Sequence, residues 1–279
     1  MSSETLTWDS EADWDDAQSE DNVKHASGSV EVSGLPDGVV AEYPMVNDNG
    51  DTSVVEDFAG SYDGDVTGAS YNSSGGPHGQ GSYTFDSDSD RIEYPDGAAI
   101  GGTSERTLLA WFNVDDTGDR QMIYGYGNDT EYEAFELEVN YPYNPEGNSD
   151  NQAENTVGVH TWSASVTGPN GLIEDYSAWH MFAATHEGGG SMDGVSLYYD
   201  GDSISTSVND SGSLDTGTAN FASGSSVAHG DNTTNVVSGD VAYPVILDRE
   251  LSASEIQSIY DNFKDGTRDG TLTTAKKVS

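Results

Sequence analysis

Two carboxylates on one predicted strand have the spacing closest to a catalytic pair. Residues 131–138 read Glu-Tyr-Glu-Ala-Phe-Glu-Leu-Glu, and Glu136 and Glu138 share one face if this segment is a regular strand. Retaining hydrolysis of a glycosidic bond uses two carboxyl groups about 5 Å apart, one as acid and one as nucleophile. The competing interpretation, a solvated acidic face, is favoured in so acidic a chain. We therefore predict no catalytic residues, and no Ser-His-Asp or metal-hydrolase spacing occurs elsewhere in the sequence.

The patterns that suggest metal binding are weak. Asp86, Asp88 and Asp90 begin like a calcium loop. The sixth position is Arg91 rather than glycine and the twelfth is Gly97 rather than glutamate, so a hairpin turn is the better interpretation. The histidines, which form no close metal-binding pair in the sequence, are His25, His78, His160, His180, His186 and His229. The sequence leaves the presence of a metal open, with calcium as a possible cofactor because turns offer many carboxylates.

A long segment rich in aromatic and amide side chains is the best candidate for ligand binding. Residues 140–155 read NYPYNPEGNSDNQAEN, a predicted loop, and loops of this length in compact domains are often functional. Sugar sites combine aromatic walls with a few polar groups that fix the hydroxyls. The predicted ligand-binding residues are Tyr141, Tyr143, Asn144, Asn148 and Trp162. The alternative is a loop stiffened by tyrosine and proline, or a contact between subunits.

The overall charge restricts the partners. The 279 residues include 50 acidic and 9 basic side chains, for a net charge of −41, and the acids are spread along nearly the whole chain. Such self-repulsion is tolerated in molar salt, where the Debye length falls to about 3 Å, so the composition predicts a halophilic source. Nucleic acid is excluded as a partner because the chain has no basic patch. The absence of cysteine excludes disulfides and thiolate metal sites.

Short alternating segments predict strands through most of the chain. In residues 177–206, Trp179 and Met181 alternate with His180 and Phe182, and Gly188 breaks the pattern before the next strand. An Asp-Gly pair at 200–201 then predicts a type I′ hairpin. Residues 83–94 read as strand, turn and returning strand, and residues 156–166 read as one strand. The sequence predicts one clear helix, which begins with the capping box of Ser252 and Glu255.

The two ends of the chain differ from the middle. We expect an acidic N-terminal arm at residues 1–38, a main domain at 39–265 and a mildly basic tail at 266–279. Trp8 and Trp14 in the arm suggest packing against the domain or anchoring on a neighbouring subunit. The sequence shows neither a signal peptide nor an apolar run long enough to span a membrane, so membrane insertion is not expected.

Several pieces, taken in order, resemble the laminin-G-like jelly-roll domains of the concanavalin A-like class. The segments that carry the resemblance are the turn at 57–64, residues 83–92, the Ala-Trp strand at 109–112, Trp179-His180, residues 197–201 and the closing strand and helix cap at 239–256. The resemblance implies an all-β fold, a two-sheet antiparallel jelly-roll sandwich with one short C-terminal helix. It also implies structural roles for Trp111, Trp179 and His180.

The resemblance bears on activity in two places. Glucanases of this superfold carry Glu-x-Asp-x-x-Glu on one strand, and residues 131–138 lack the middle aspartate and its spacing. The closing strand reads Val-Ala-Tyr-Pro-Val at 241–245, where some members have acids that help to bind calcium. The family mostly binds sugars or proteins, so the resemblance implies recognition rather than catalysis.

The expected function is therefore a non-enzymatic recognition, adhesion or structural protein of a halophilic system. We favour a virion surface component that contacts host cell-envelope glycan or protein, assembled as a homo-oligomer or with neighbouring virion subunits through the arm and the tail. A virion protein is released by lysis and needs no export signal. The alternatives are a secreted or cell-surface carbohydrate-binding module and a glycan hydrolase or lyase.

Overall fold

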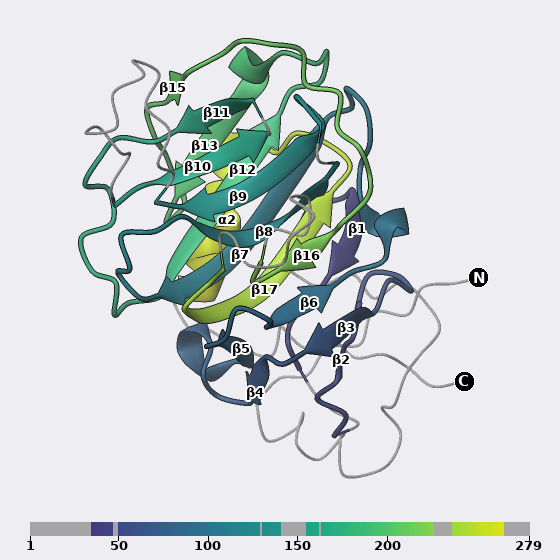
Figure 1. The fold of residues 1–279 in the computed structure, drawn as a ribbon, viewed down its shortest axis with the longest axis vertical. Helices are drawn as coiled ribbons and strands as arrows, with labels where there is room; N and C mark the ends of the chain where they lie inside the picture. The colour runs from purple at the N-terminus through teal and green to yellow at the C-terminus, as the bar shows by residue number, and fades with distance from the viewer. Residues whose placement is uncertain are drawn as a thin grey trace.

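Alternating apolar residues build two antiparallel sheets that pack face to face (Figure 1). The computed structural model describes residues 35–46, 50–128, 130–140, 155–161, 163–225 and 236–264. Every strand pairing in this part of the chain is antiparallel. The all-β, two-sheet jelly-roll sandwich implied by the resemblance is confirmed.

The first sheet has eight strands, and its longest members, β7 and β17, lie side by side at its centre. In sheet order its strands are β14 (Asp202–Ser203), β13 (Val195–Tyr199), β12 (His180–His186), β7 (Arg106–Val114), β17 (Gly239–Leu247), β5 (Ser82–Phe85) and β4 (Ser70–Asn72), with β1 (Val39–Glu42) pairing with part of β17. The predicted hairpin turn is confirmed, because Asp200 and Gly201 have φ values of 49° and 86°.

The second sheet has nine strands and contains the candidate functional site. In order these are β15 (Ser207–Val208), β11 (Ala164–Thr167), β10 (Val157–Thr161), β9 (Ala134–Val139), β8 (Gln121–Gly127), β16 (Ala222–Ser223), β6 (Arg91–Glu93), β3 (Gly64–Thr67) and β2 (Val54–Val55). The described connections contain short 3₁₀ helices at Pro77–Gly79, Asp96–Ala98 and Met192–Gly194.

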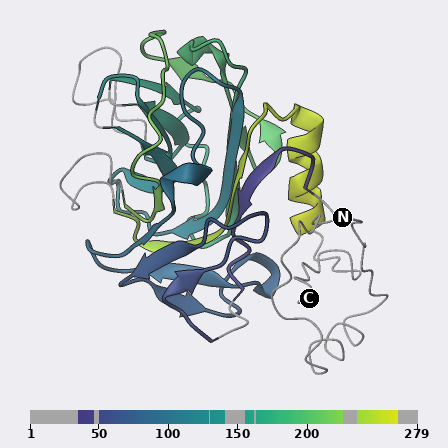
Figure 2. The ribbon, with the colours of Figure 1, turned by 90° about the vertical axis from the view of Figure 1, so that its right-hand side faces the viewer.

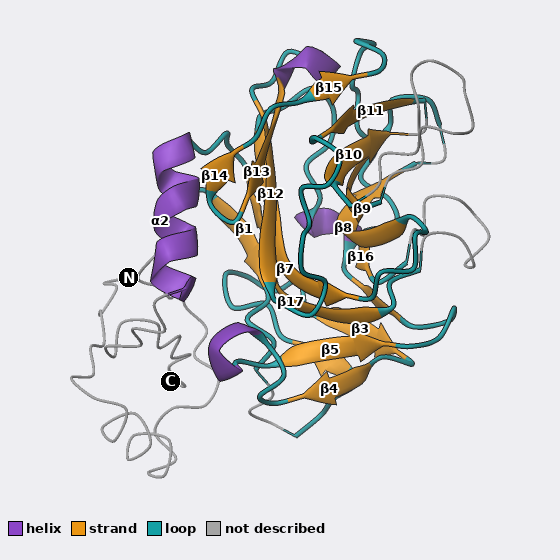
Figure 3. Cartoon of the chain, turned by 90° about the vertical axis from the view of Figure 1, so that its left-hand side faces the viewer, coloured by secondary structure: helices purple, strands orange, loops and turns teal. Residues whose placement is uncertain are grey.

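The main core lies between the two sheets, and a second apolar layer covers the outer face of the first sheet. Phe182 and Ala184 of β12 point into the main core, whereas Met181 and Ala183 point to the opposite side, as the alternation predicts. Helix α2 (Ala253–Lys264) packs over that opposite side, away from the nine-stranded sheet (Figures 2 and 3). Both faces of β12 are therefore buried.

The capping box positions α2 against the first sheet. The backbone N–H of Glu255 donates to Ser252 Oγ, and the backbone N–H of Ser252 donates to a Glu255 carboxylate oxygen at 2.8 Å. The Trp111 ring stacks on Tyr260 of the helix, with ring centroids 5.5 Å apart. The predicted cap is confirmed, and the structural role expected for Trp111 follows from its burial at 2% exposure.

Two local expectations were wrong. Residues 156–166 form two strands, β10 and β11, which pair with each other antiparallel, because the chain turns back between Thr161 and Ala164. The strands before and after the turn at 86–90 do not pair with each other. β5 pairs within the first sheet and β6 within the second, so the chain crosses from one sheet to the other at that turn. Alternation within a strand does not reveal its pairing partner, which long-range packing decides.

Several predictions concern residues beyond the described ranges. Residues 1–34 of the arm, with Trp8 and Trp14, and the tail at 266–279 lie outside the described residues. The domain limits at 38 and 265 therefore stay predictions. No described helix has the length and apolar character needed to cross a membrane.

Candidate functional site

A polar cluster lies on the face of the nine-stranded sheet that points away from the core. Phe135 and Leu137 of β9 point into the core, so the alternating residues Glu136 and Glu138 lie on the other face. His160 of β10 stands directly opposite Glu136 in the antiparallel register and shares its face. Strand register thus brings together residues that lie more than twenty positions apart in the sequence.

Glycines on the neighbouring strands flank the two carboxylates. Gly125 of β8 lies opposite Glu136, and Gly158 of β10 lies opposite Glu138. A Cβ atom at position 125 would come within 2.5 Å of the Glu136 Cα atom, so the close approach of β8 to β9 requires glycine there. Each glutamate therefore has a neighbour without a side chain on one side.

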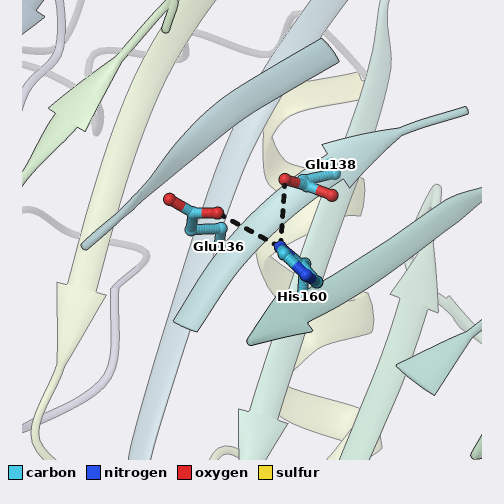
Figure 4. Close-up of side chains that lie close together, drawn as sticks. All are labelled: Glu136, Glu138 and His160. Carbon is cyan, nitrogen blue, oxygen red and sulfur yellow. Dashed lines mark ion pairs between the residues drawn. The ribbon is translucent and has the colours of Figure 1, made fainter. Parts of the chain in front are cut away.

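The side chains converge on a small volume (Figure 4). His160 Nδ1 lies 3.5 Å from Glu136 Oε2 and 3.8 Å from Glu138 Oε1. One ligand atom from each of the three residues lies within 4.8 Å of the others. Arg120 completes the cluster, with Nε 2.8 Å from Glu138 Oε1 and Nη2 3.7 Å from Glu136 Oε2.

The cluster is removed from solvent. Both glutamate side chains are 0% exposed and His160 is 3% exposed. Burial raises the pKa of Glu138 well above its usual range, the Arg120 guanidinium opposes that rise and the neighbouring Glu136 adds to it. The arrangement can hold a cation or retain a proton between the carboxylates, because both reduce the cost of two buried negative charges.

These observations correct two sequence-based expectations. Glu136 and Glu138 do share one face, but that face is not solvated. His160 has two carboxylates beside it, although the histidines show no close pair in the sequence. The i, i+2 spacing of the glutamates was visible in the sequence. The register that adds His160, and the contact with Arg120, were not.

The predicted ligand-binding residues Tyr141, Tyr143, Asn144, Asn148 and Trp162 lie outside the described residues and stay a prediction. The structure does describe the two ends of the segment that holds the first four. Asn140 and Asn155 have φ values of 56° and 55°, a left-handed conformation that asparagine tolerates. The Asn155 N–H donates to Asn140 Oδ1 at 2.8 Å, and Tyr176 Oη lies 2.9 Å from the same oxygen. These bonds join the ends where the segment leaves β9 and returns to β10.

Other residues considered from the sequence have local structural roles. The Asp90 carboxylate accepts hydrogen bonds from the N–H groups of Asp86 and Ser87, as expected for a turn. His180 is half-buried between the Asp200 carboxylate, 2.8 Å from Nδ1, and the Asp175 carbonyl, 2.9 Å from Nε2. The structural role that the resemblance implied for His180 agrees with these contacts.

The arrangement of two antiparallel sheets and a short closing helix defines a lectin-type jelly-roll sandwich. The family model described as the concanavalin A-like lectin/glucanases superfamily, of laminin-G type, matches residues 86–257. The chain belongs to this family. No curated protein matches the sequence.

Solved structures with the same fold include sugar-processing proteins and toxin domains. Trypanosoma rangeli sialidase in complex with the inhibitor DANA matches at 14% identity and a TM-score of 0.54, over 88% of this chain and 37% of the sialidase chain. Domain 4 of AbnA, a GH43 extracellular arabinanase from Geobacillus stearothermophilus, in complex with arabinotriose, matches at 19% identity and a TM-score of 0.53, over 80% of this chain and 98% of that domain. The binding domain of Paraclostridial Mosquitocidal Protein 1 matches at 15% identity and a TM-score of 0.51, over 81% of this chain and 52% of that chain. At these identities the likeness is one of fold.

Proposed function

We propose that this protein is a non-enzymatic recognition and adhesion protein that binds carbohydrate on a cell surface. The observation that carries the choice of recognition over catalysis is the complete burial of Glu136 and Glu138, which are also paired with Arg120. A glycosidase needs its acid and its nucleophile at the scissile bond, with access for water. Two carboxylates at 0% exposure do not meet that requirement in this conformation.

Carbohydrate is the proposed ligand because a solved domain of the same fold binds a sugar. The arabinanase domain, which the match covers almost completely, was solved in complex with a trisaccharide. Residues 141–154 include tyrosine and asparagine side chains of the kind that sugar sites use, and the flanking Asn140 and Asn155 are joined by a hydrogen bond.

Binding of the purified protein to isolated cell envelopes of halophiles in molar salt tests this proposal, with released reducing ends assayed in the same tube. We expect binding without release, and loss of binding in Tyr143→Ala. Asn72→Ala, at an exposed position on the other sheet, is the matched control and should bind as the wild type does. Failure to bind envelopes or any arrayed glycan would overturn the carbohydrate proposal and leave a structural protein.

The more specific form of the proposal is a virion surface component of a halophilic virus that contacts its host and assembles as a homo-oligomer. The even spread of the 50 acidic residues supports the salt-adapted part, because molar salt screens their repulsion. We expect to find the protein in purified virus particles. Native mass spectrometry from high salt should show an oligomer, and Trp8→Ala and Trp14→Ala should each weaken that oligomer. A monomer in both wild type and variants would contradict the assembly. Detection in cell envelopes without virus would favour the secreted or cell-surface alternative.

Glycan hydrolysis is the second candidate, and the closeness of the two glutamates favours it. Their oxygens lie within 4.8 Å of each other, near the separation of about 5 Å used by retaining enzymes. Burial also raises the pKa of Glu138, as expected of a general acid, and the Glu136 carboxylate lies beside it. Release of reducing ends by the wild type, abolished in both Glu136→Gln and Glu138→Gln, would establish this candidate in place of the first.

A further inference from the structure

We propose that Glu136, Glu138 and His160 bind one divalent first-row transition-metal ion of the Mn²⁺ or Zn²⁺ class, in a buried site that joins β9 to β10. The proposal concerns these three side chains and does not depend on whether the protein binds carbohydrate. It rests on four features of the cluster: the distances between its ligand atoms, the buried Glu138 oxygen that accepts no hydrogen bond from the described residues, its net charge and its ligand types.

The distances fit coordination better than hydrogen bonding. Ligands about 2.1 Å from a tetrahedral metal lie about 3.4 Å from one another. The distances from His160 Nδ1 to the glutamate oxygens are 3.5 and 3.8 Å, and all three ligand atoms lie within 4.8 Å. A hydrogen bond from an imidazole nitrogen to a carboxylate is at most about 3.2 Å long. A small contraction around an ion would bring these three atoms, which face one another in Figure 4, into bonding range.

Glu138 provides an independent observation. Its side chain is 0% exposed and its Oε2 atom accepts no hydrogen bond from the residues that the structure describes. A buried carboxylate oxygen normally has a partner, because leaving it without one costs free energy. A metal ion bound by both oxygens of the Glu138 carboxylate would supply this partner.

The charge of the cluster also calls for a cation. Two carboxylates and one guanidinium leave a net charge of −1 when the imidazole is neutral, in a place without solvent. A proton is the competing occupant. It would be held between the Glu136 and Glu138 carboxylates, whose hydrogen bond contributes to the raised pKa of Glu138. Arg120 contacts the same two carboxylate oxygens, Glu138 Oε1 at 2.8 Å and Glu136 Oε2 at 3.7 Å, so a bound ion would share them with the guanidinium.

The ligand types select the class of metal. One imidazole nitrogen and two carboxylates suit Mn²⁺ and Zn²⁺. Ca²⁺ prefers six to eight oxygen ligands, and Mg²⁺ prefers octahedral oxygen and retains water. The chain has no cysteine to compete for a soft metal. A site of this kind would tie together the two strands that flank residues 141–154.

The test uses the full chain in molar KCl after removal of metal with a chelator. Calorimetry and thermal unfolding are measured with Mn²⁺, Zn²⁺, Ca²⁺ and Mg²⁺. We expect one Mn²⁺ or Zn²⁺ per chain and a rise in Tm, since an ion that binds only the folded state stabilises it. Glu138→Gln and His160→Gln should each raise the Kd by at least about tenfold. Glu187→Gln, an exposed glutamate outside the cluster, should bind as the wild type does.

A spectroscopic measurement on the wild type keeps the proposal testable if a variant fails to fold. Bound Mn²⁺ should show electron spin-echo modulation from a ¹⁴N nucleus, which changes when histidine is labelled with ¹⁵N. The proposal is overturned if neither Mn²⁺ nor Zn²⁺ binds at millimolar concentration. Preference for Ca²⁺ or Mg²⁺, or unchanged affinity in both cluster variants, would also overturn it. Without metal binding, a Glu138→Gln variant more stable than the wild type would identify a shared proton instead.

Discussion

Glu42 should make the stability of this protein depend on pH in an unusual direction. This residue of β1 is 1% exposed, and the Tyr243 hydroxyl donates a hydrogen bond to its carboxylate. Burial raises the pKa of Glu42 from 4.5 to about 8, the bond from Tyr243 opposes the rise, and the nearby Asp57 carboxylate adds to it. The folded protein therefore keeps this carboxyl group protonated at neutral pH.

The sign of the effect follows from proton binding. Between pH 4.5 and about 8, the folded state holds a proton on Glu42 that the unfolded state has released, so raising the pH destabilises the fold. The free energy of unfolding falls by up to about 1.4 kcal/mol per pH unit, or at most about 5 kcal/mol over the whole window. Below the window both states are protonated, and above it both are ionised, so the contribution is constant at each end. High salt screens this buried group little.

Glu42→Gln removes the titrating group while keeping its shape. We expect the variant to lose less stability than the wild type from about pH 5 to about pH 8, and to be the more stable protein at the upper end. Urea unfolding at constant molar KCl, followed by tryptophan fluorescence, measures the difference. Asp88→Asn removes a charge from an exposed turn and should parallel the wild type. If the free energies of unfolding of the wild type and Glu42→Gln change in parallel from about pH 5 to about pH 8, Glu42 is ionised in the folded state and the reasoning fails.

Three substitutions test how the fold is held together, each by the midpoint of urea unfolding. Ser252→Ala removes the cap of α2 and should cost about 1 kcal/mol, whereas an unchanged midpoint would mean that the cap contributes nothing. Gly201→Ala should cost at least about 1 kcal/mol, because φ is 86° and the new Cβ would lie 2.9 Å from Gln257 Nε2. Gly50→Ala, with φ of 75° and no atom within 4 Å, is its control for strain alone. Arg106→Met should cost about 3 kcal/mol or more, because this fully buried guanidinium donates to three backbone carbonyls. A tolerated Arg106→Met would show that those carbonyls find other partners.

Salt adaptation can explain the acidic residues on the surface of this chain, but not the acidic residues that are buried. Glu42, Asp57, Glu136 and Glu138 are all 1% exposed or less. Asp57 accepts backbone hydrogen bonds from Glu42 and from the turn that follows, which stabilises its charge. The glutamates of the β9 cluster have a guanidinium and an imidazole beside them. Composition suggests that acids serve salt adaptation, and at these positions burial makes that explanation insufficient.

The sequence determined the fold class and many local features. Alternation at positions 179–186 defined a strand buried on both faces, because successive side chains point to opposite sides of a sheet. The Asp-Gly pair at 200–201 and the cap of Ser252 and Glu255 were predicted because turns and helix starts depend on a few adjacent residues. The order of these pieces, compared with the family pattern, was enough to predict the jelly roll.

Tertiary structure alone decided the candidate site. The i, i+2 spacing of Glu136 and Glu138 is local, so it was predictable that they share one face of the sheet. Whether that face is exposed to solvent or buried was not predictable. Burial depends on what covers a sheet, and the partner of a strand depends on register. The register of β9 and β10 placed His160 beside the glutamates, and a contact from outside the β9–β10 pair added Arg120. Pairing between distant segments is a property of the whole fold, which is why a sequence without close histidine pairs brings one histidine and two glutamates together.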